Sequence, residues 1–308
     1  MPLSTSSSKP LSARRGIAVL LILLAVSYAL VEWVAWFGFS HISSIQRRIS
    51  RETMETLKIR PVENGKPSML VCGNSLLLEG VNFPGLHDRL DKAYSIHRFV
   101  IESTEYLDWY FGLQRLFREG MRPSYVMVML TTNQLVRDST RGAYFAYFLM
   151  SPRDIFQVKK KAHLDTTTAS NYFAAAYSPW MGAQSDIRKW ILLRVLSHFT
   201  DMTEALHPPY PAIPPDGQIW SIVPDRLAAL QKICQTYGSR LVIVVPPSST
   251  GVKAELIQQC GRSRGVAVLV PFRTLPPSDF RDGFHLNSAG NTLFTEKLAR
   301  EVGLGVMK

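Results

Sequence analysis

Residues 71–83 read VCGNSLLLEGVNF, and this stretch decides the fold expected for the chain. The apolar run at residues 69–72 is typical of a strand, and it ends at Gly-Asn-Ser before a leucine-rich segment. A polar Ser75 at such a strand-to-helix junction has two interpretations. It is a turn or helix-cap residue, or it is a nucleophile held at the edge of an α/β sheet.

Strand-like and helix-like segments alternate on either side of this junction. Strand patterns occupy residues 69–72, 97–101, 125–130, 240–245 and 266–270, and helical patterns occupy residues 105–119, 224–237, 252–259 and 288–302. The run YVMVML at 125–130 is apolar throughout, which is typical of a strand buried on both faces of a parallel sheet. The alternation predicts an α/β domain over residues 68–308, with a parallel sheet covered by helices on both sides.

The alternation stops over residues 137–223. This stretch holds the aromatic run AYFAYFLM, a lysine run at 159–161, an apolar WILLRVL and the proline-rich segment HPPYPAIPPDG. We expect an inserted, mostly helical subdomain or cap here. Its aromatic side chains have two interpretations, ordinary core packing or a surface on which a substrate stacks.

A long apolar segment precedes the domain. Residues 16–39, GIAVLLILLAVSYALVEWVAWFGF, carry one charged residue, Glu32, and a helix of this length crosses the hydrocarbon core of a bilayer. A cleaved signal peptide is the alternative, but its apolar region would be shorter. The sequence therefore predicts one transmembrane helix, with a tail at residues 1–15 and a partly helical stalk or linker at residues 40–67. Its last part, residues 60–67, is expected to be a loop rich in proline and glycine.

The flanks of the apolar segment leave its orientation open. Aromatic residues, Trp33, Trp36 and Phe37 among them, gather at its C-terminal end, as they do at membrane interfaces. Basic residues flank both ends in nearly equal number, so the positive-inside rule does not decide which side is cytoplasmic.

Composition argues against several kinds of site. The formal net charge is +11, from 35 Lys and Arg against 24 Asp and Glu, which favours contact with anionic surfaces. The basic residues are scattered and no nucleic-acid-binding module is visible, so we expect no nucleic-acid partner. Three cysteines without a CxxC motif argue against a metal site. Cys72 fits a small core residue, whereas Cys234 and Cys260 could form a disulfide bond, a pairing that the sequence leaves open.

A serine hydroxyl becomes nucleophilic when a positioned base accepts its proton and a third group orients that base. Ser75 therefore needs a histidine and a carboxylate. The segment RDGFHLNSAG at residues 281–290 offers both, because Asp282 precedes His285 by three residues, just before the last predicted helix. Asp279, six residues before the histidine, is the competing carboxylate.

Together these motifs resemble those of the SGNH/GDSL hydrolase superfamily. That family carries its nucleophile in a Gly-Asp/Asn-Ser block and its base in an Asp-x-x-His block, which correspond here to GNS at 73–75 and DGFH at 282–285. The resemblance covers residues 68–135 and 224–305 and leaves out the insertion. It implies a flavodoxin-like three-layer α/β/α parallel sheet, with Ser75 as the nucleophile. His285 is then the base, and Asp282 orients it.

The family also implies an oxyanion hole, built from the nucleophile's own N–H, a glycine N–H after the second strand and an Asn side chain after the third. Asn133 lies in the segment TTNQ that follows the third strand, so the N–H of Ser75 and the side chain of Asn133 are the expected donors. The second strand is followed by Glu-Ser-Thr without a glycine, and Ser103 or Thr104 could replace it. These departures point away from the lipase-like members and towards the membrane-anchored branch.

The resemblance implies a membrane-anchored serine esterase or O-acyltransferase acting on O-acyl groups, above all O-acetyl groups, of an extracytoplasmic polysaccharide or cell-wall polymer. The expected location is the inner (plasma) membrane, crossed once, with the catalytic domain in the periplasm. A polytopic membrane acyltransferase is an expected partner, and no metal or organic cofactor is expected. Two alternatives stay open: a non-catalytic subunit that binds a polymer or a partner in a biosynthetic complex, and a lipase or thioesterase.

Overall fold

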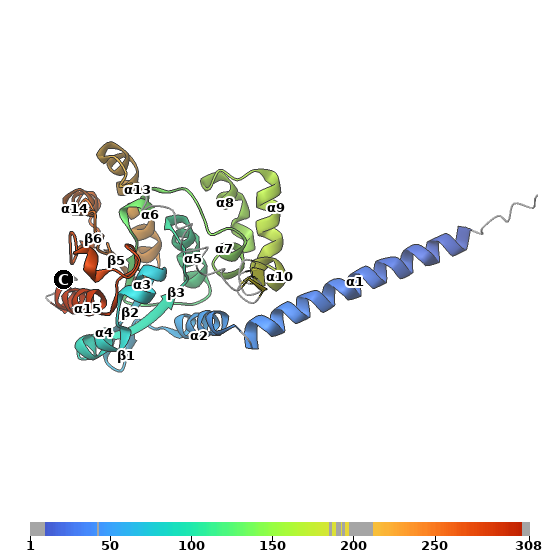
Figure 1. The fold of residues 1–308 in the computed structure, drawn as a ribbon, viewed down its shortest axis with the longest axis horizontal. Coiled ribbons are helices and arrows are strands. Elements are labelled where there is room, and N and C mark those ends of the chain that lie inside the picture. The colour runs from blue at the N-terminus through green and yellow to red at the C-terminus, as the bar shows by residue number, and fades with distance from the viewer. Residues whose placement is uncertain are drawn as a thin grey trace, which may run out of the picture.

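The computed structural model describes residues 10–41, 43–184, 187–188, 192, 195–196 and 212–303. It is a mixed α/β domain with a central sheet, and a long N-terminal helix extends away from it (Figure 1). The strands are β1 (Val62–Glu63), β2 (Lys66–Gly73), β3 (Ser95–Val100), β4 (Tyr125–Met129), β5 (Arg240–Val244) and β6 (Ala267–Leu269). The helices are α1 (Pro10–His41), α2 (Ser44–Lys58), α3 (Ser75–Gly80), α4 (Phe83–Leu90), α5 (Tyr106–Arg118), α6 (Thr132–Val136), α7 (Ala143–Phe148), α8 (Ile155–Lys161), α9 (Thr166–Ala175), α10 (Pro179–Gly182), α13 (Asp216–Thr236), α14 (Ala254–Arg262) and α15 (Ser288–Gly303).

Five strands pair in parallel in the spatial order β3-β2-β4-β5-β6. This is the strand order of flavodoxin-like sheets, in which ligands bind at the carboxyl ends of the strands. The register aligns those ends, because Gly73 at the end of β2 pairs with Val100 of β3 and with Met129 of β4. Loops that follow these three strands are thereby brought to one edge of the sheet.

Alternate residues of the strands enter two separate hydrophobic cores. In β2, Leu70 and Cys72 join a core built with α5, α13 and α14, whereas Met69 and Val71 join a second core built with α3, α4 and α15. Strand side chains point alternately to the two faces of a sheet, so the two cores cover opposite faces. The five predicted strands are present, and the central strands β4 and β5 are almost wholly apolar because they are buried on both faces.

All three cysteines are buried free thiols, so the Cys234–Cys260 bond that the sequence left open is not formed. They belong to the same core as α5 and α13. Burial raises the pKa of the Cys234 thiol to about 12, which makes it an unreactive core residue.

Two boundaries differ from the sequence analysis. Residues 60–67, expected as a loop, contain a short hairpin in which β1 pairs antiparallel with β2. Its turn is Asn64-Gly65, with φ of 51° and 75°, and Asn-Gly is the pair that favours this left-handed turn conformation. Helix α13 begins at Asp216, not at Pro224, which lies buried inside it. A proline inside a helix removes one backbone hydrogen bond, but the helix can still continue through it.

Helix α1 carries the predicted membrane segment. Its stretch Arg14–Gly38 is 25 residues long with a mean hydropathy of 2.4, and its apolar window of 18 residues is not buried inside the structure. By length and composition it could cross a membrane.

The predicted stalk is partly a packed element. Helix α2 lies against β3, at the edge of the parallel sheet, and buries Ile49 and Glu52. The Glu52 carboxylate accepts hydrogen bonds from the Val100 N–H at 2.9 Å and the Arg98 Nε at 2.8 Å. Arg48 donates to the Val100 carbonyl at 2.7 Å and pairs with Glu102. Side chains of α2 therefore bond to backbone groups of β3, which is one way to cover an exposed sheet edge.

We expect Glu52→Ala to destabilise the domain, because it leaves Arg98 and the Val100 N–H without their acceptor. Breaking a buried ion pair in this way costs about 3 kcal/mol, or about 6–12 °C in Tm for a domain of this size. The measurement is thermal unfolding of the detergent-solubilised full chain. Glu55→Ala, on the exposed side of the same helix, is the control and should shift Tm by about 2 °C or less. Equal shifts in both variants would contradict this account of the edge.

Candidate active site

Ser75 is the first residue of α3, immediately after β2. The cap of this helix is Asn74, whose side chain accepts a hydrogen bond from the Leu76 N–H at 3.0 Å. Capping is therefore done by the neighbouring residue, and the interpretation of Ser75 as a cap is wrong. Its hydroxyl instead donates to, or accepts from, His285 Nε2 at 3.0 Å, although 210 residues separate the two in sequence.

His285 lies in a tight loop that hydrogen bonds to the Asp282 side chain stabilise. Phe280 and Leu286 form a bridge across this loop, and the Arg281 N–H donates to the His285 carbonyl at 2.8 Å. Asp282 Oδ1 accepts from the backbone N–H of Phe284 at 3.0 Å and of His285 at 2.7 Å. The side chain of an Asp bonding to backbone two residues further on is typical of an Asx turn.

The other carboxylate oxygen of Asp282 orients the imidazole. Asp282 Oδ2 lies 2.8 Å from His285 Nδ1. Because an ionised carboxylate can only accept, Nδ1 carries the proton in the neutral ring and Nε2 is left as the acceptor that faces the Ser75 hydroxyl. Ser75, His285 and Asp282 are thus joined in the order that a serine triad requires. Of the two carboxylates that the sequence offered, Asp279 and Asp282, it is Asp282 that contacts His285.

Hydrogen bonds keep Asp282 ionised. Partial burial of its carboxyl raises the pKa, but bonds from the His285 backbone, the imidazole and the Phe284 backbone outweigh that effect and lower the pKa to about 2. Asp282 is therefore an anion throughout the physiological range, as an orienting carboxylate must be.

Helices α15 and α3 hold the two halves of the site together. Asn287 caps α15 by accepting from Ala289 N–H and Gly290 N–H at 3.0 and 3.1 Å, and it donates to the Ser278 carbonyl. Asn291 donates to the carbonyl of Glu79, at the end of α3, at 2.6 Å. The Glu79 side chain also pairs with Arg281 at 2.7 Å. These contacts connect the loop that carries His285 to α3, the helix that begins at Ser75.

The turn after β3 contains Ser103 and Thr104, the two residues between which the sequence could not choose a replacement for the family's glycine. Ser103 has φ of 57°, in the left-handed region that favours glycine. Thr104 is buried, and its carbonyl accepts from the Asn74 side chain at 2.9 Å, so this turn is bonded to the residue just before Ser75. Ser103 thus adopts a backbone conformation that favours glycine, although this turn contains no glycine.

Asn133 is the second residue of α6, the short helix that follows β4. Thr131 caps this helix by accepting from the Gln134 N–H at 3.2 Å, and the Gln134 side chain bonds back to the Thr131 N–H. Since β4 is the neighbour of β2 and their ends are in register, Asn133 and Ser75 follow adjacent strand ends. The role of Asn133 as an oxyanion donor stays a prediction.

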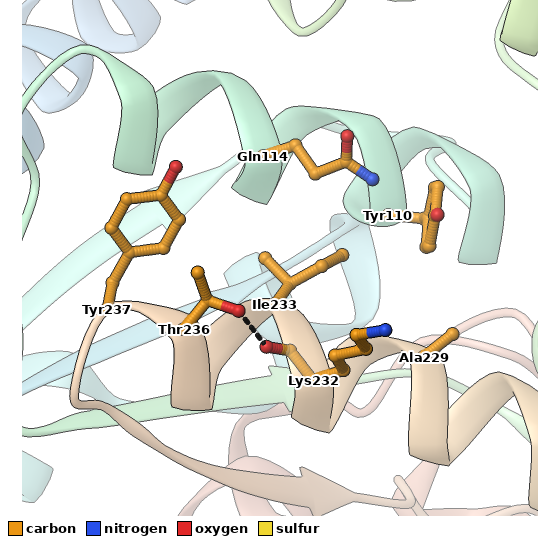
Figure 2. Close-up of a pocket in the computed structure, with 7 residues that line it drawn as sticks. All are labelled: Tyr110, Gln114, Ala229, Lys232, Ile233, Thr236 and Tyr237. Carbon is orange, nitrogen blue, oxygen red and sulfur yellow. Dashed lines mark hydrogen bonds between the residues drawn. The ribbon is translucent and has the colours of Figure 1, made fainter.

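A pocket of about 320 Å³ lies elsewhere, between α5 and α13 (Figure 2). Tyr110 and Gln114 of α5 face Ile233 and Thr236 of α13 across it. None of the triad residues lines this pocket. It is next to the turn after α13, which leads to the start of β5, and so it belongs to the edge opposite the site.

Within the described residues, no group of three or more His, Cys, Asp or Glu side chains is placed to hold a metal ion.

Comparisons with known proteins identify no family. No family model matches the chain, and no curated protein matches it. Among solved structures it is similar to TesA, with a TM-score of 0.39 and 12% identity over 76% of this chain and 97% of that one. It is also similar to a protein assigned as a platelet activating factor from Streptococcus pneumonia, with a TM-score of 0.37 and 11% identity over 84% and 94% of the two chains. At these values the likenesses carry no argument about activity.

The lowered pKa of Asp282 predicts how its contribution to stability changes with pH. The folded-state pKa lies below the ordinary Asp value, so the stabilisation is complete above about pH 4 and is lost as the pH falls towards about 2. The Tm difference between the native chain and Asp282→Asn should stay constant from about pH 7 to about pH 5 and shrink below about pH 4. Asp88→Asn, an exposed carboxylate, is the control. A difference that does not change with pH would contradict the assignment.

Proposed function

We propose that the chain is a membrane-anchored serine esterase or O-acyltransferase with the three-layer architecture of SGNH hydrolases. The observation that carries the proposal is the linked contact from Ser75 Oγ to His285 Nε2 at 3.0 Å and from His285 Nδ1 to Asp282 at 2.8 Å. Serine nucleophiles on several unrelated folds are activated by this arrangement.

In the first half of the reaction, Ser75 Oγ attacks the carbonyl carbon of an acyl ester while His285 Nε2 takes the hydroxyl proton. The oxyanion that forms is stabilised by the N–H of Ser75 and the side chain of Asn133. We add the backbone N–H of Ser103 as the third donor, because its φ of 57° is the conformation expected of the family's glycine. Collapse of this intermediate breaks the bond to the alkoxide, which takes the proton from His285 and leaves an acyl-serine.

In the second half, His285 takes a proton from the acceptor as the acceptor oxygen attacks the acyl-serine. The bond between the acyl carbon and Ser75 Oγ then breaks, and His285 returns the proton to Ser75 Oγ, which restores the hydroxyl. Water as the acceptor gives an esterase, and a sugar hydroxyl gives an acyltransferase. No proton or electron is left over in either case, so the residues named here complete the reaction without a cofactor. Asp282 remains ionised throughout and balances the charge of the imidazolium.

The substrate that we propose is an O-acylated, above all O-acetylated, polysaccharide or cell-wall polymer outside the cytoplasm. The membrane helix would hold the enzyme near the surface where such polymers are assembled, alongside a polytopic acyltransferase that supplies acyl groups. A lipase or thioesterase, which would prefer long acyl chains, is the alternative within the same chemistry. A non-catalytic binding subunit is the alternative outside it.

Ser75→Ala separates catalysis from binding. The variant should fold normally, because Asn74 performs the capping, while p-nitrophenyl acetate turnover and fluorophosphonate labelling fall by several orders of magnitude. Melting and turnover are measured on the same sample. Ser221→Ala, which removes an exposed hydroxyl from α13, is the matched control and should keep full activity. Unchanged turnover in Ser75→Ala would leave the binding-subunit alternative.

The anchor requires a defined topology. We propose that α1 crosses the inner membrane with the N-terminus in the cytoplasm and the domain in the periplasm, because a surface polymer is reached only from that side. A reporter fused after Lys308 should be active if it folds only outside the cytoplasm, and inactive if it folds only inside. The opposite result would contradict this orientation.

A further inference from the structure

Helix α10 contacts α1 inside its apolar stretch. The Glu32 carboxylate of α1 accepts hydrogen bonds from the Ser178 hydroxyl and from the Trp180 N–H, the latter at 3.2 Å. Ala35, one turn further along α1, is 5% exposed. The sole charged residue of the predicted membrane segment is thus bonded to the inserted subdomain, as an ionisable group near a bilayer has to be bonded to protein or water.

This contact fixes the depth of α10 relative to a bilayer. The apolar stretch ends at Gly38, and Glu32 precedes it by six residues, or about 9 Å of helix. The whole stretch of 25 residues is about 38 Å long, against about 30 Å of hydrocarbon. Glu32 and the start of α10 therefore lie within about 9 Å, measured along α1, of the end of the apolar stretch.

The surface next to this contact has the composition of a membrane interface. Residues 166–184, which form α9 and α10, contain no Asp, Glu, Lys or Arg, although 19% of the chain is charged. Phe173, Tyr177 and Trp180 are exposed by 47%, 67% and 39%. The rings of Phe173 and Tyr177 lie 5.4 Å apart. Exposed, uncharged and aromatic surfaces are what the interfacial layer of a bilayer accepts.

The surface is held rigidly on the domain. Tyr172 and Ala175, on the opposite side of α9, are buried. Gly182 of α10 packs so closely on α7 that an added Cβ would come within 2.5 Å of Tyr147. Helices α9 and α10 lie on the side of the domain towards which α1 extends (Figure 1). Placing α1 in a bilayer therefore brings α9 and α10 towards its surface.

We infer that the exposed face of α9 and α10 around Phe173, Tyr177 and Trp180, here called the aromatic face, docks into the interfacial layer of the lipid bilayer. The inference rests on the proposed membrane anchoring by α1. Together with Trp33 and Trp36 of α1, which are also exposed, the aromatic face gives the domain two attachments to the membrane. It would then sit at a fixed height and tilt, rather than swing on a flexible stalk.

The test places a nitroxide label on the full chain in vesicles of phosphatidylcholine and phosphatidylglycerol. Labels are attached at Tyr177→Cys and, independently, at Phe173→Cys, while the three native cysteines are buried. Leu293→Cys, on an exposed position of α15, is the matched control in water. Trp33→Cys reports on α1 itself. Collision of each label with oxygen, which enters lipid, and with a water-soluble nickel chelate gives its depth.

We expect labels at Tyr177→Cys and Phe173→Cys to collide with the nickel chelate several-fold less often than a label at Leu293→Cys, and more often with oxygen. Full exposure of both to the chelate, with Trp33→Cys protected, would overturn the docking while leaving the anchor intact. That outcome would point to a protein partner for the aromatic face. Exposure of Trp33→Cys as well would refute the anchor and the docking together.

Discussion

The parallel register of β2 with its two neighbours is the constraint on which the site depends. Because Gly73 pairs with both Val100 and Met129, the chain leaves three adjacent strands at the same level. Gly73 also lets α3 begin at once, since a Cβ there would approach the Met129 carbonyl to 3.0 Å and Leu77 to 3.2 Å. Ser75, the left-handed turn at Ser103 and Asn133 all follow strand ends that are held in this way.

The loop before α15 presents the His285 imidazole in an orientation that Asp282 has already set. One carboxylate does both tasks, with Oδ1 bonding to the backbone of the loop and Oδ2 to the imidazole. The His285 ring therefore reaches Ser75 with its tautomer set by a residue three positions away. Contacts from α15 to Ser278 and Glu79 then fix the loop against α3. The local geometry of the loop orients the His285 imidazole, and tertiary packing brings this ring to Ser75.

Two glutamates, Glu32 of α1 and Glu52 of α2, bond the N-terminal helices to the domain. Glu52 of α2 bonds to the backbone and side chains of β3, and Arg48 on the same helix pairs with Glu102, next to Ser103. Glu32 of α1 bonds to the start of α10.

The sequence by itself determined the alternation of strands and helices, the five parallel strands, the apolar N-terminal helix and the pairing of Asp282 with His285. These features depend on periodicity, burial and short spacing, which are local. It could not decide whether Ser75 or Asn74 caps α3, where α13 begins, or that α2 covers the sheet edge. Each of these depends on which groups meet across the fold: Ser75 faces His285 from 210 residues away, and the buried Glu52 carboxylate bonds to Arg48, Arg98 and the Val100 N–H. Tertiary packing decides these partners, because the role of a polar residue depends on the group with which it forms hydrogen bonds.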